Sequence, residues 1–146
     1  MSKLVVKITS VGVSARGFDM VFDWLASIGL SFRNPSVNAV TAWTDDGQIT
    51  TTVETVVESA RHRQTGSVQM WFASGNDINL SWAADGMVVF LDGTTVKERA
   101  AVIHALIDNL MTVYAQFRES WHMCVGTDDE VFGEPATKPG SRTSER

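Results

Sequence analysis

The stretch from residue 67 to residue 121 constrains the fold most, because it reads as three short strands followed by one long helix. Apolar and polar residues alternate over 67–74 and again over 77–83, which is typical of strands with one buried face. Residues 87–91 are continuously apolar, as expected of a strand near the centre of a sheet. The stretch therefore predicts a strand meander whose apolar face packs against the helix that follows it.

The two turns of this meander set its expected register. Asp85-Gly86 is typical of a two-residue type I′ turn, and such a turn pairs Trp82 with Val89. For the first hairpin, the preceding Ser-Gly-Asn-Asp run favours a three-residue loop that pairs Met70 with Leu80. A two-residue loop would instead place an apolar side chain opposite a polar one, since a slip of one residue turns every side chain to the other face.

The long helix begins at a capping box, in which Thr95 and Glu98 satisfy each other's backbone donors. A helix of roughly 26 residues is about 39 Å long at the usual rise. Leu106 and Val113 widen the apolar stripe that we expect to face the sheet. That stripe follows steps of four and three through Val96, Ala100, Ile103, Ile107, Leu110, Tyr114, Phe117 and Trp121.

The rest of the chain supplies further elements. Residues 4–9 read as a strand, and residues 19–29 read as a short helix that Asp19 caps and Gly29 ends. Residues 37–44 read as a strand that Asp45-Asp46-Gly47 closes. Residues 123–125 form an edge strand or an extended packing segment.

Residues 48–63 are ambiguous. Their β-branched residues favour a strand, whereas their periodicity and a Thr51–Glu54 capping box favour a helix. We prefer the helix, with a strand over 48–53 as a possible lead-in.

The resulting order, β-α-β-(α)-β-β-β-α, predicts an α+β fold with a single mainly antiparallel sheet packed against a long C-terminal helix. One domain accounts for residues 1–132. Residues 133–146 contain too few apolar side chains to order themselves, and we expect a disordered C-terminal tail.

Charge and composition exclude several classes of partner. The net charge is −5, and residues 1–132 hold 9 basic and 15 acidic side chains. This balance argues against binding to nucleic acid or to an anionic membrane, since both need clustered cations. No apolar run approaches the roughly 20 residues that span a bilayer. The single cysteine, Cys124, excludes an internal disulfide and favours a cytoplasmic location.

The sequence contains no motif that points to catalysis. It lacks zinc-ligand spacing, a phosphate-binding glycine loop and a nucleophile elbow, so we predict no catalytic residues, no metal and no cofactor. His104 with Asp108, and His122 with Cys124, have the spacing of reactive pairs. A solvent-facing pair and a packed thiol are the simpler interpretations. His62 lies between two arginines, where the cations also suit the end of a helix.

The function that we expect is protein binding without catalysis, through an acidic surface that suits a basic partner. Small acidic immunity or antitoxin proteins and secretion chaperones share this size and charge. The long helix also offers a surface for self-association. The alternative is a small enzyme or ligand-binding domain with a pocket between sheet and helix, using Trp82, Tyr114, His104 or His122. The expected partner-binding residues are Trp71, Phe90, Asp45, Asp46, Asp128, Asp129 and Glu130.

Overall fold

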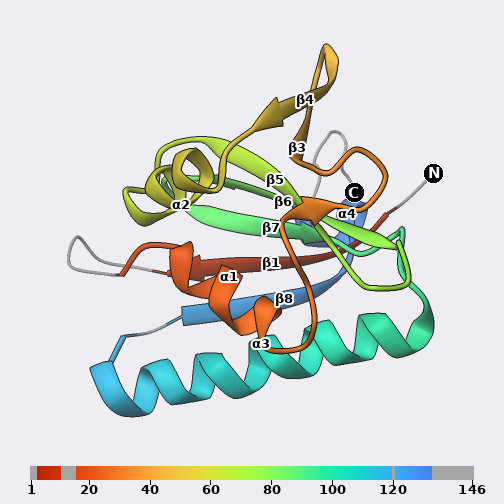
Figure 1. Cartoon of the computed structure of the whole chain (residues 1–146). Coiled ribbons are helices and arrows are strands. Elements are labelled where there is room, and N and C mark those ends of the chain that lie inside the picture. The colour runs from red at the N-terminus through yellow and green to blue at the C-terminus, as the bar shows by residue number, and fades with distance from the viewer. Residues whose placement is uncertain (1–2, 11–15, 120, 133–146) are drawn as a thin grey trace, which may run out of the picture.

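The structure of the chain is a computed structural model that describes residues 3–10, 16–119 and 121–132 (Figure 1). Its elements, in chain order, are β1 (Leu4–Ser10), α1 (Asp19–Ala26), β2 (Arg33–Asn34), β3 (Ala39–Thr44), β4 (Gly47–Thr51), α2 (Val53–Arg61), β5 (Gly66–Trp71), β6 (Asp77–Ala83), β7 (Gly86–Phe90), α3 (Val96–Phe117), β8 (Trp121–Thr127) and α4 (Asp128–Phe132).

Two antiparallel sheets organise these elements. The larger has the strand order β5-β6-β7-β1-β8, and the smaller has the order β2-β3-β4. The predicted α+β fold, with a mainly antiparallel sheet and a long helix packed against it, is confirmed. The apolar strand β7 lies at the centre of the larger sheet, as its composition predicts. The tip of the β3–β4 hairpin projects from the larger sheet, while β3 lies beside β5 (Figure 1).

The register of the meander differs from the prediction by two residues in both hairpins. Trp82 pairs with Met87 rather than Val89, and Met70 pairs with Ile78 rather than Leu80. A shift of two keeps every side chain on its predicted face, because strand side chains alternate with a period of two. The buried faces are therefore correct although the paired residues are not.

Gly86 explains the shift in the second hairpin. The turn consists of Ala84 and Asp85, and Gly86 is already the first residue of β7. A Cβ atom at Gly86 would lie 2.9 Å from the carbonyl oxygen of Ile8. This glycine allows β1 to approach β7 closely, instead of supplying the positive φ of a type I′ turn. In the first hairpin that role belongs to Gly75, with a φ of 93°.

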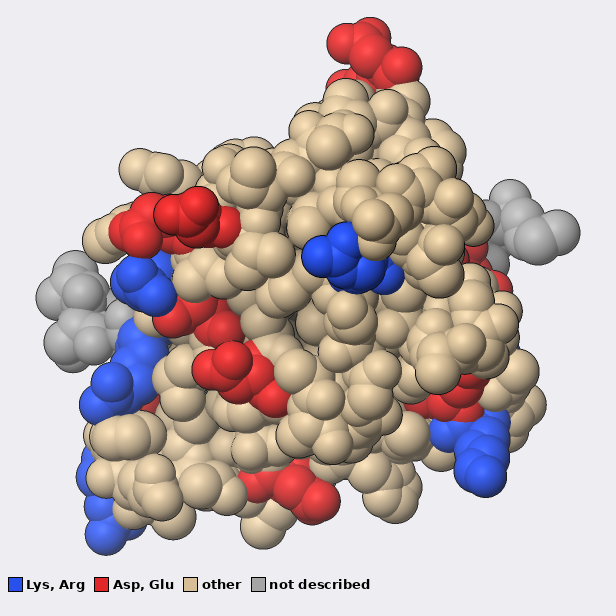
Figure 2. Space-filling view, viewed as in Figure 1, with Lys and Arg blue, Asp and Glu red and all other residues tan. Residues whose placement is uncertain are grey.

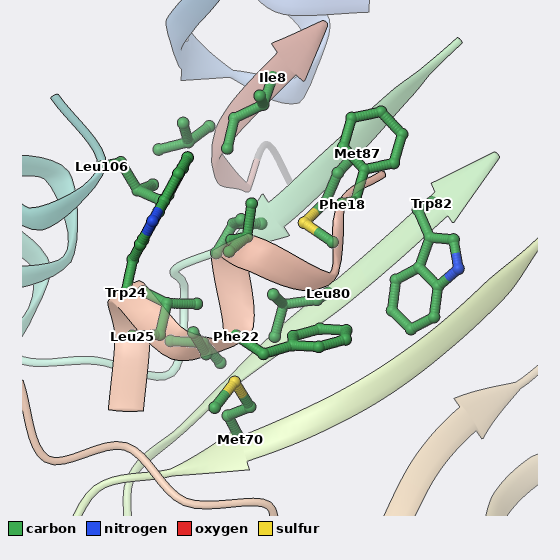
Figure 3. Close-up of a cluster of buried hydrophobic side chains, with 14 of the residues drawn as sticks. Ile8, Phe18, Phe22, Trp24, Leu25, Met70, Leu80, Trp82, Met87 and Leu106 are labelled. Carbon is green, nitrogen blue, oxygen red and sulfur yellow. The ribbon is translucent and has the colours of Figure 1, made fainter. Parts of the chain in front are cut away.

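The core lies between the larger sheet and the three helices α1, α2 and α3. Figure 3 shows Phe22 and Leu25 of α1 directed at the sheet, with Leu106 of α3 beside Trp24. Aromatic rings make edge contacts in this layer, including Phe22 with Trp82 at 5.5 Å between centroids. Further fully buried side chains come from the strands: Ile8, Met70, Ile78, Leu80, Met87 and Val89.

The long helix α3 begins at its predicted capping box, but it is shorter and rotated relative to the prediction. It ends at Phe117, where Arg118 adopts a left-handed conformation with a φ of 59°. Trp121 starts β8 instead, and its ring lies 5.9 Å from that of Phe18. Of the predicted stripe, Leu106 and Val113 are buried, and Ile103 and Leu110 are half-buried against the core. The residues that α3 buries are Val102, Ala105, Leu106 and Val113, whereas Val96, Ala100, Ile107, Tyr114 and Phe117 are exposed.

The ambiguous segment contains both predicted elements, the strand β4 and the helix α2. Thr52 caps α2 by accepting a hydrogen bond from the Thr55 backbone, so the predicted Thr51–Glu54 box is wrong by one residue. In α1, Asp19 occupies the first turn and makes no cap hydrogen bond. The predicted edge strand is confirmed as β8, which pairs with β1 along seven residues. The predicted tail, 133–146, lies outside the described residues.

Glu98 links the start of α3 to the β5–β6 loop. Hydrogen bonds from Ser74, from the Thr95 backbone and from Asn76 lower the pKa of Glu98 to about 2. The carboxylate therefore stabilises the fold above its unfolded-state pKa of about 4.3, and this contribution is lost as the pH falls from there to about 2.

We accordingly expect Glu98→Gln to lower the free energy of unfolding by about 1 kcal/mol at pH 7. Urea unfolding at several pH values measures this difference, which should shrink below pH 4. Glu54→Gln is the matched control, since Glu54 also lies in a first helical turn but makes no side-chain hydrogen bond within the described segments. If the loss of unfolding free energy caused by Glu98→Gln stayed constant down to pH 2, the stabilising role of the ionised Glu98 carboxylate would be contradicted.

Candidate functional site

The larger sheet has a core face under α1, α2 and α3 and a second face, which we call the open face, beside the β3–β4 hairpin and α4. Side chains at alternate positions point to the open face, among them Gln69 of β5, Ser81 of β6 and Val88 and Phe90 of β7. Within the 48–63 segment, Gln48 reaches this face as part of the β3–β4 hairpin. Both α1 and α2 pack on the core side, where Val56 and Ala60 join the core.

The β3–β4 hairpin is anchored to the open face by one buried amide. The Gln69 side-chain oxygen accepts hydrogen bonds of 2.7 Å from both Thr41 and Gln48, which lie on the two strands of the hairpin. Its amide nitrogen donates to Asp77 at 2.8 Å. Ser67 also donates to the Trp43 carbonyl oxygen. These bonds hold the hairpin beside β5 as a wall along the open face.

A hollow of about 480 Å³ lies at the foot of this wall. Asn79, Ser81 and Phe90 form part of its floor, and the end of β3 contributes Trp43 and Asp45. Lys3 and Asp92 lie at the same hollow, and the Lys3 ammonium is 5.8 Å from the centroid of the Phe90 ring.

A second hollow, of about 290 Å³, adjoins the first, since Ser81 lines both. Val88 contributes to its floor, and Phe132 of α4 and Lys7 lie along it, with the Lys7 ammonium 5.5 Å from the Phe132 ring. Glu130 accepts hydrogen bonds from the Thr127 backbone and hydroxyl, which lower its pKa and close the turn into α4. We call the two hollows together the open-face trough.

The trough combines an exposed aromatic side chain with carboxylates that have no ion-pair partner among the described residues. Trp43 is 52% exposed although it belongs to a strand. Asp45 and Asp92 form no ion pair within the described parts of the chain. Such a site offers stacking and apolar contact to a ligand, together with carboxylates for a cation. Among the described residues, no group of three or more metal-ligating side chains comes together.

Another hollow, of about 710 Å³, lies on the opposite side of the hairpin, between it and α2. Ile49 and Val56 line it, with Glu54 and Glu58 at its border. Glu58 is engaged by Arg61 and His62 of its own helix. The hairpin therefore separates two concave surfaces. The trough holds Asp45 and Asp92, and the hollow beside α2 holds Glu54, which likewise forms no ion pair with the described residues.

The structure brings together two of the residues predicted to bind a partner, Phe90 and Asp45, in the trough. Asp46 lies beside them in the hairpin turn. Trp71 belongs to the open face, but its backbone pairs with Ser31 and it does not line the trough. The predicted acidic residues Asp128, Asp129 and Glu130 lie in the first turn of α4.

A single acidic patch is not visible on the face shown in Figure 2. Asp and Glu side chains are scattered there among Lys and Arg, and one acidic group stands at the tip of the β3–β4 hairpin. The acidic side chains on this face therefore do not form a continuous charged surface.

The residues weighed for catalysis are dispersed. His104 and Tyr114 are exposed on α3, and His122 and Cys124 are exposed on β8. Trp82 is buried and donates to Ser59. None of the three hollows contains two of the four residues that the pocket hypothesis names.

The basic segment after α2 is structural. Arg63 donates to the backbone carbonyls of Ser10 and Arg16, and its guanidinium lies 4.6 Å from the centroid of the Phe18 ring. Burial lowers the pKa of Arg63 despite the attraction of Glu119. Arg63 thus fastens the end of α2 to the strand β1, a role that no local sequence pattern indicates.

Sequence reasoning missed Trp43, Lys3 and Asp92 as site residues. Trp43 was read as an ordinary strand residue, although a tryptophan two positions before a turn is a signal that it lies near a hairpin tip. Lys3 and Asp92 flank strands that are neighbours only through the β1–β7 pairing.

Comparison of the chain with protein-family models, with curated proteins and with solved structures found no match. The helices in the described part of the chain are all too short or too polar to cross a membrane.

Proposed function

We propose that this chain is a non-enzymatic protein-binding module that receives a segment of a partner protein in the open-face trough. The observation that carries the proposal is the convergence of exposed Trp43, Phe90 and the unpaired carboxylate of Asp45 in one concave surface. Aromatic side chains at the centre of a concave patch dominate the binding energy of many interfaces.

The expected partner segment follows from the lining. An apolar or aromatic side chain packs between Trp43 and Phe90, and a Lys or Arg of the segment reaches Asp45 or Asp92. The trough is shallow and extended across Ser81, which suits an extended peptide better than a compact small molecule.

The proposal extends to the class and setting of the protein. Its length and acidic balance are those of small immunity or antitoxin proteins and secretion chaperones, an analogy of size and charge. Asp45 and Asp92 favour a basic partner. A cytoplasmic setting suits the exposed thiol of Cys124.

A library of random peptides, selected for binding to the full chain, tests this function. We expect the enriched peptides to carry Lys or Arg close to an aromatic or large apolar residue. Trp43→Ala should weaken binding of an enriched peptide at least tenfold, which corresponds to about 1.4 kcal/mol. Asp45→Asn combined with Asp92→Asn should weaken it severalfold and reduce its dependence on salt.

Val37→Ala is the matched control, because Val37 is also an exposed apolar residue near the small sheet but does not line the trough. The Val37→Ala variant should bind the enriched peptide with the same affinity as the unaltered chain. Selected peptides that bind Trp43→Ala and the double asparagine variant as tightly as the unaltered chain would rule out the trough as the binding site.

A further inference from the structure

The helix α3 carries an exposed apolar stripe, and at its C-terminal end the guanidinium of Arg16 lies over the Phe117 ring, 3.7 Å from the centroid. This stripe lies to one side of the face that Val102, Leu106 and Val113 bury. Four large apolar side chains exposed along one side of a helix are typical of a protein interface rather than of free surface. The stripe consists of Ile107, Met111, Tyr114 and Phe117, which are 42%, 68%, 55% and 39% exposed.

The spacing of the stripe suits a second helix. Its residues recur at steps of four and three, the pattern with which side chains of one helix fit between those of another. The half-buried Ile103 and Leu110 continue the same pattern toward the core. A second copy of this chain offers an identical stripe, and a two-fold axis brings two such stripes face to face with the helices antiparallel.

The charges beside the stripe agree with this arrangement. Asp108 and Arg118 are exposed, and neither forms an ion pair within the parts of the chain that the structure describes. They are ten residues apart, about 15 Å along a helix. Their midpoint lies at Val113, close to the middle of the exposed stripe. Antiparallel helices centred there therefore place each Asp108 level with Arg118 of the second copy.

We propose that two copies of the chain associate through the C-terminal halves of α3, packed antiparallel with Asp108 of each copy opposite Arg118 of the other. The contact covers about three helical turns of each chain, and we expect it to bury less than the roughly 1,200 Å² at the lower end of stable interfaces. The dimer is accordingly expected to have a dissociation constant on the order of 100 µM.

Sedimentation equilibrium of the full chain, from about 10 to about 500 µM, tests the association. The mass should rise from 16.0 kDa toward about 32 kDa, twice the value for one chain. Met111→Glu and Tyr114→Glu should each weaken dimerisation at least tenfold. Gln116→Glu adds the same charge to an exposed position on another side of the helix and should leave dimerisation unchanged.

A charge swap tests the antiparallel arrangement. Asp108→Arg and Arg118→Asp should each weaken dimerisation, and the two combined should restore it. Asp tolerates the left-handed conformation at position 118. Thermal melting by circular dichroism confirms that every variant is folded.

Three results would overturn the proposal: a monomer at every concentration, a dimer that Met111→Glu and Tyr114→Glu do not weaken, or equal weakening by Gln116→Glu. A double swap that fails to restore a stripe-dependent dimer would overturn the antiparallel pairing.

Discussion

Leu106→Ala is expected to lower the free energy of unfolding by about 3–5 kcal/mol, whereas Ile107→Ala should cost less than about 1 kcal/mol. Leu106 is fully buried beside Trp24, and its truncation leaves a cavity in the core (Figure 3). Ile107, one residue further along α3, is exposed. Truncation of an exposed side chain leaves no cavity, so little stability is lost.

Urea unfolding, followed by circular dichroism at about 5 µM, measures both variants in the monomeric state that we expect at that concentration. The pair forms its own control, since both changes remove branched apolar side chains from neighbouring positions on one helix. A larger loss for Ile107→Ala than for Leu106→Ala would show that α3 is rotated to the face that the sequence periodicity predicts.

Gln69→Leu is expected to lower the free energy of unfolding by about 2–4 kcal/mol and to loosen the β3–β4 hairpin. The substitution keeps a similar volume but removes three side-chain hydrogen bonds at a buried position. The Thr41 hydroxyl is left without its partner, and an unsatisfied buried group carries the full cost of its desolvation. The wall of the trough then loses its main attachment to the sheet.

Amide hydrogen exchange over residues 39–51 measures the loosening, together with urea unfolding for the total stability. Exchange in the hairpin should accelerate, and affinity for a selected peptide should fall even though Gln69 does not line the trough. Gln116→Leu makes the same change at an exposed site and should alter neither. Unchanged exchange in the hairpin of Gln69→Leu would contradict the anchoring role of this amide.

The sequence predicted that α3 exists, where it begins and that Leu106 and Val113 face the core, but not that Ile107 and Tyr114 lie outside the buried side. Apolar residues occupy more than half of its circumference, so 3.6-residue periodicity supports both the stripe through Ile107 and the face through Leu106. The choice depends on α1, whose Trp24 contacts Trp121 and lies beside Leu106. The contact between Trp24 and Trp121 joins segments far apart in the chain, so no local sequence pattern predicts it.

The strand faces were predictable because alternation is local, whereas the register was not. The Asp85-Gly86 pair predicts a turn at Gly86. In the structure this position must be glycine for another reason, because a Cβ atom there would clash with the carbonyl oxygen of Ile8. The insertion of β1 between β7 and β8 is likewise a long-range pairing. Turn chemistry alone cannot distinguish a glycine that supplies positive φ from one that permits a close approach.

The candidate site was predicted only as separate residues. Phe90 followed from strand alternation and Asp45 from an exposed turn, but their proximity requires the hairpin to dock through Gln69. A glutamine in an alternating strand reads as a solvent-facing residue, so the anchoring role had no signature. The trough therefore became visible only with the packing of the two sheets.

The place where a selected peptide contacts the chain tests the proposed function most directly. Titration of the ¹⁵N-labelled protein with that peptide, followed by two-dimensional NMR, should shift the Trp43 indole and the backbone signals of Asp45, Ser81 and Phe90 in proportion to occupancy. Signals from the exposed side of α3, such as Met111, should remain unchanged. Shifts confined to α3 or to β8, with the Trp43 signal unmoved at saturation, would contradict the trough as the partner-binding site.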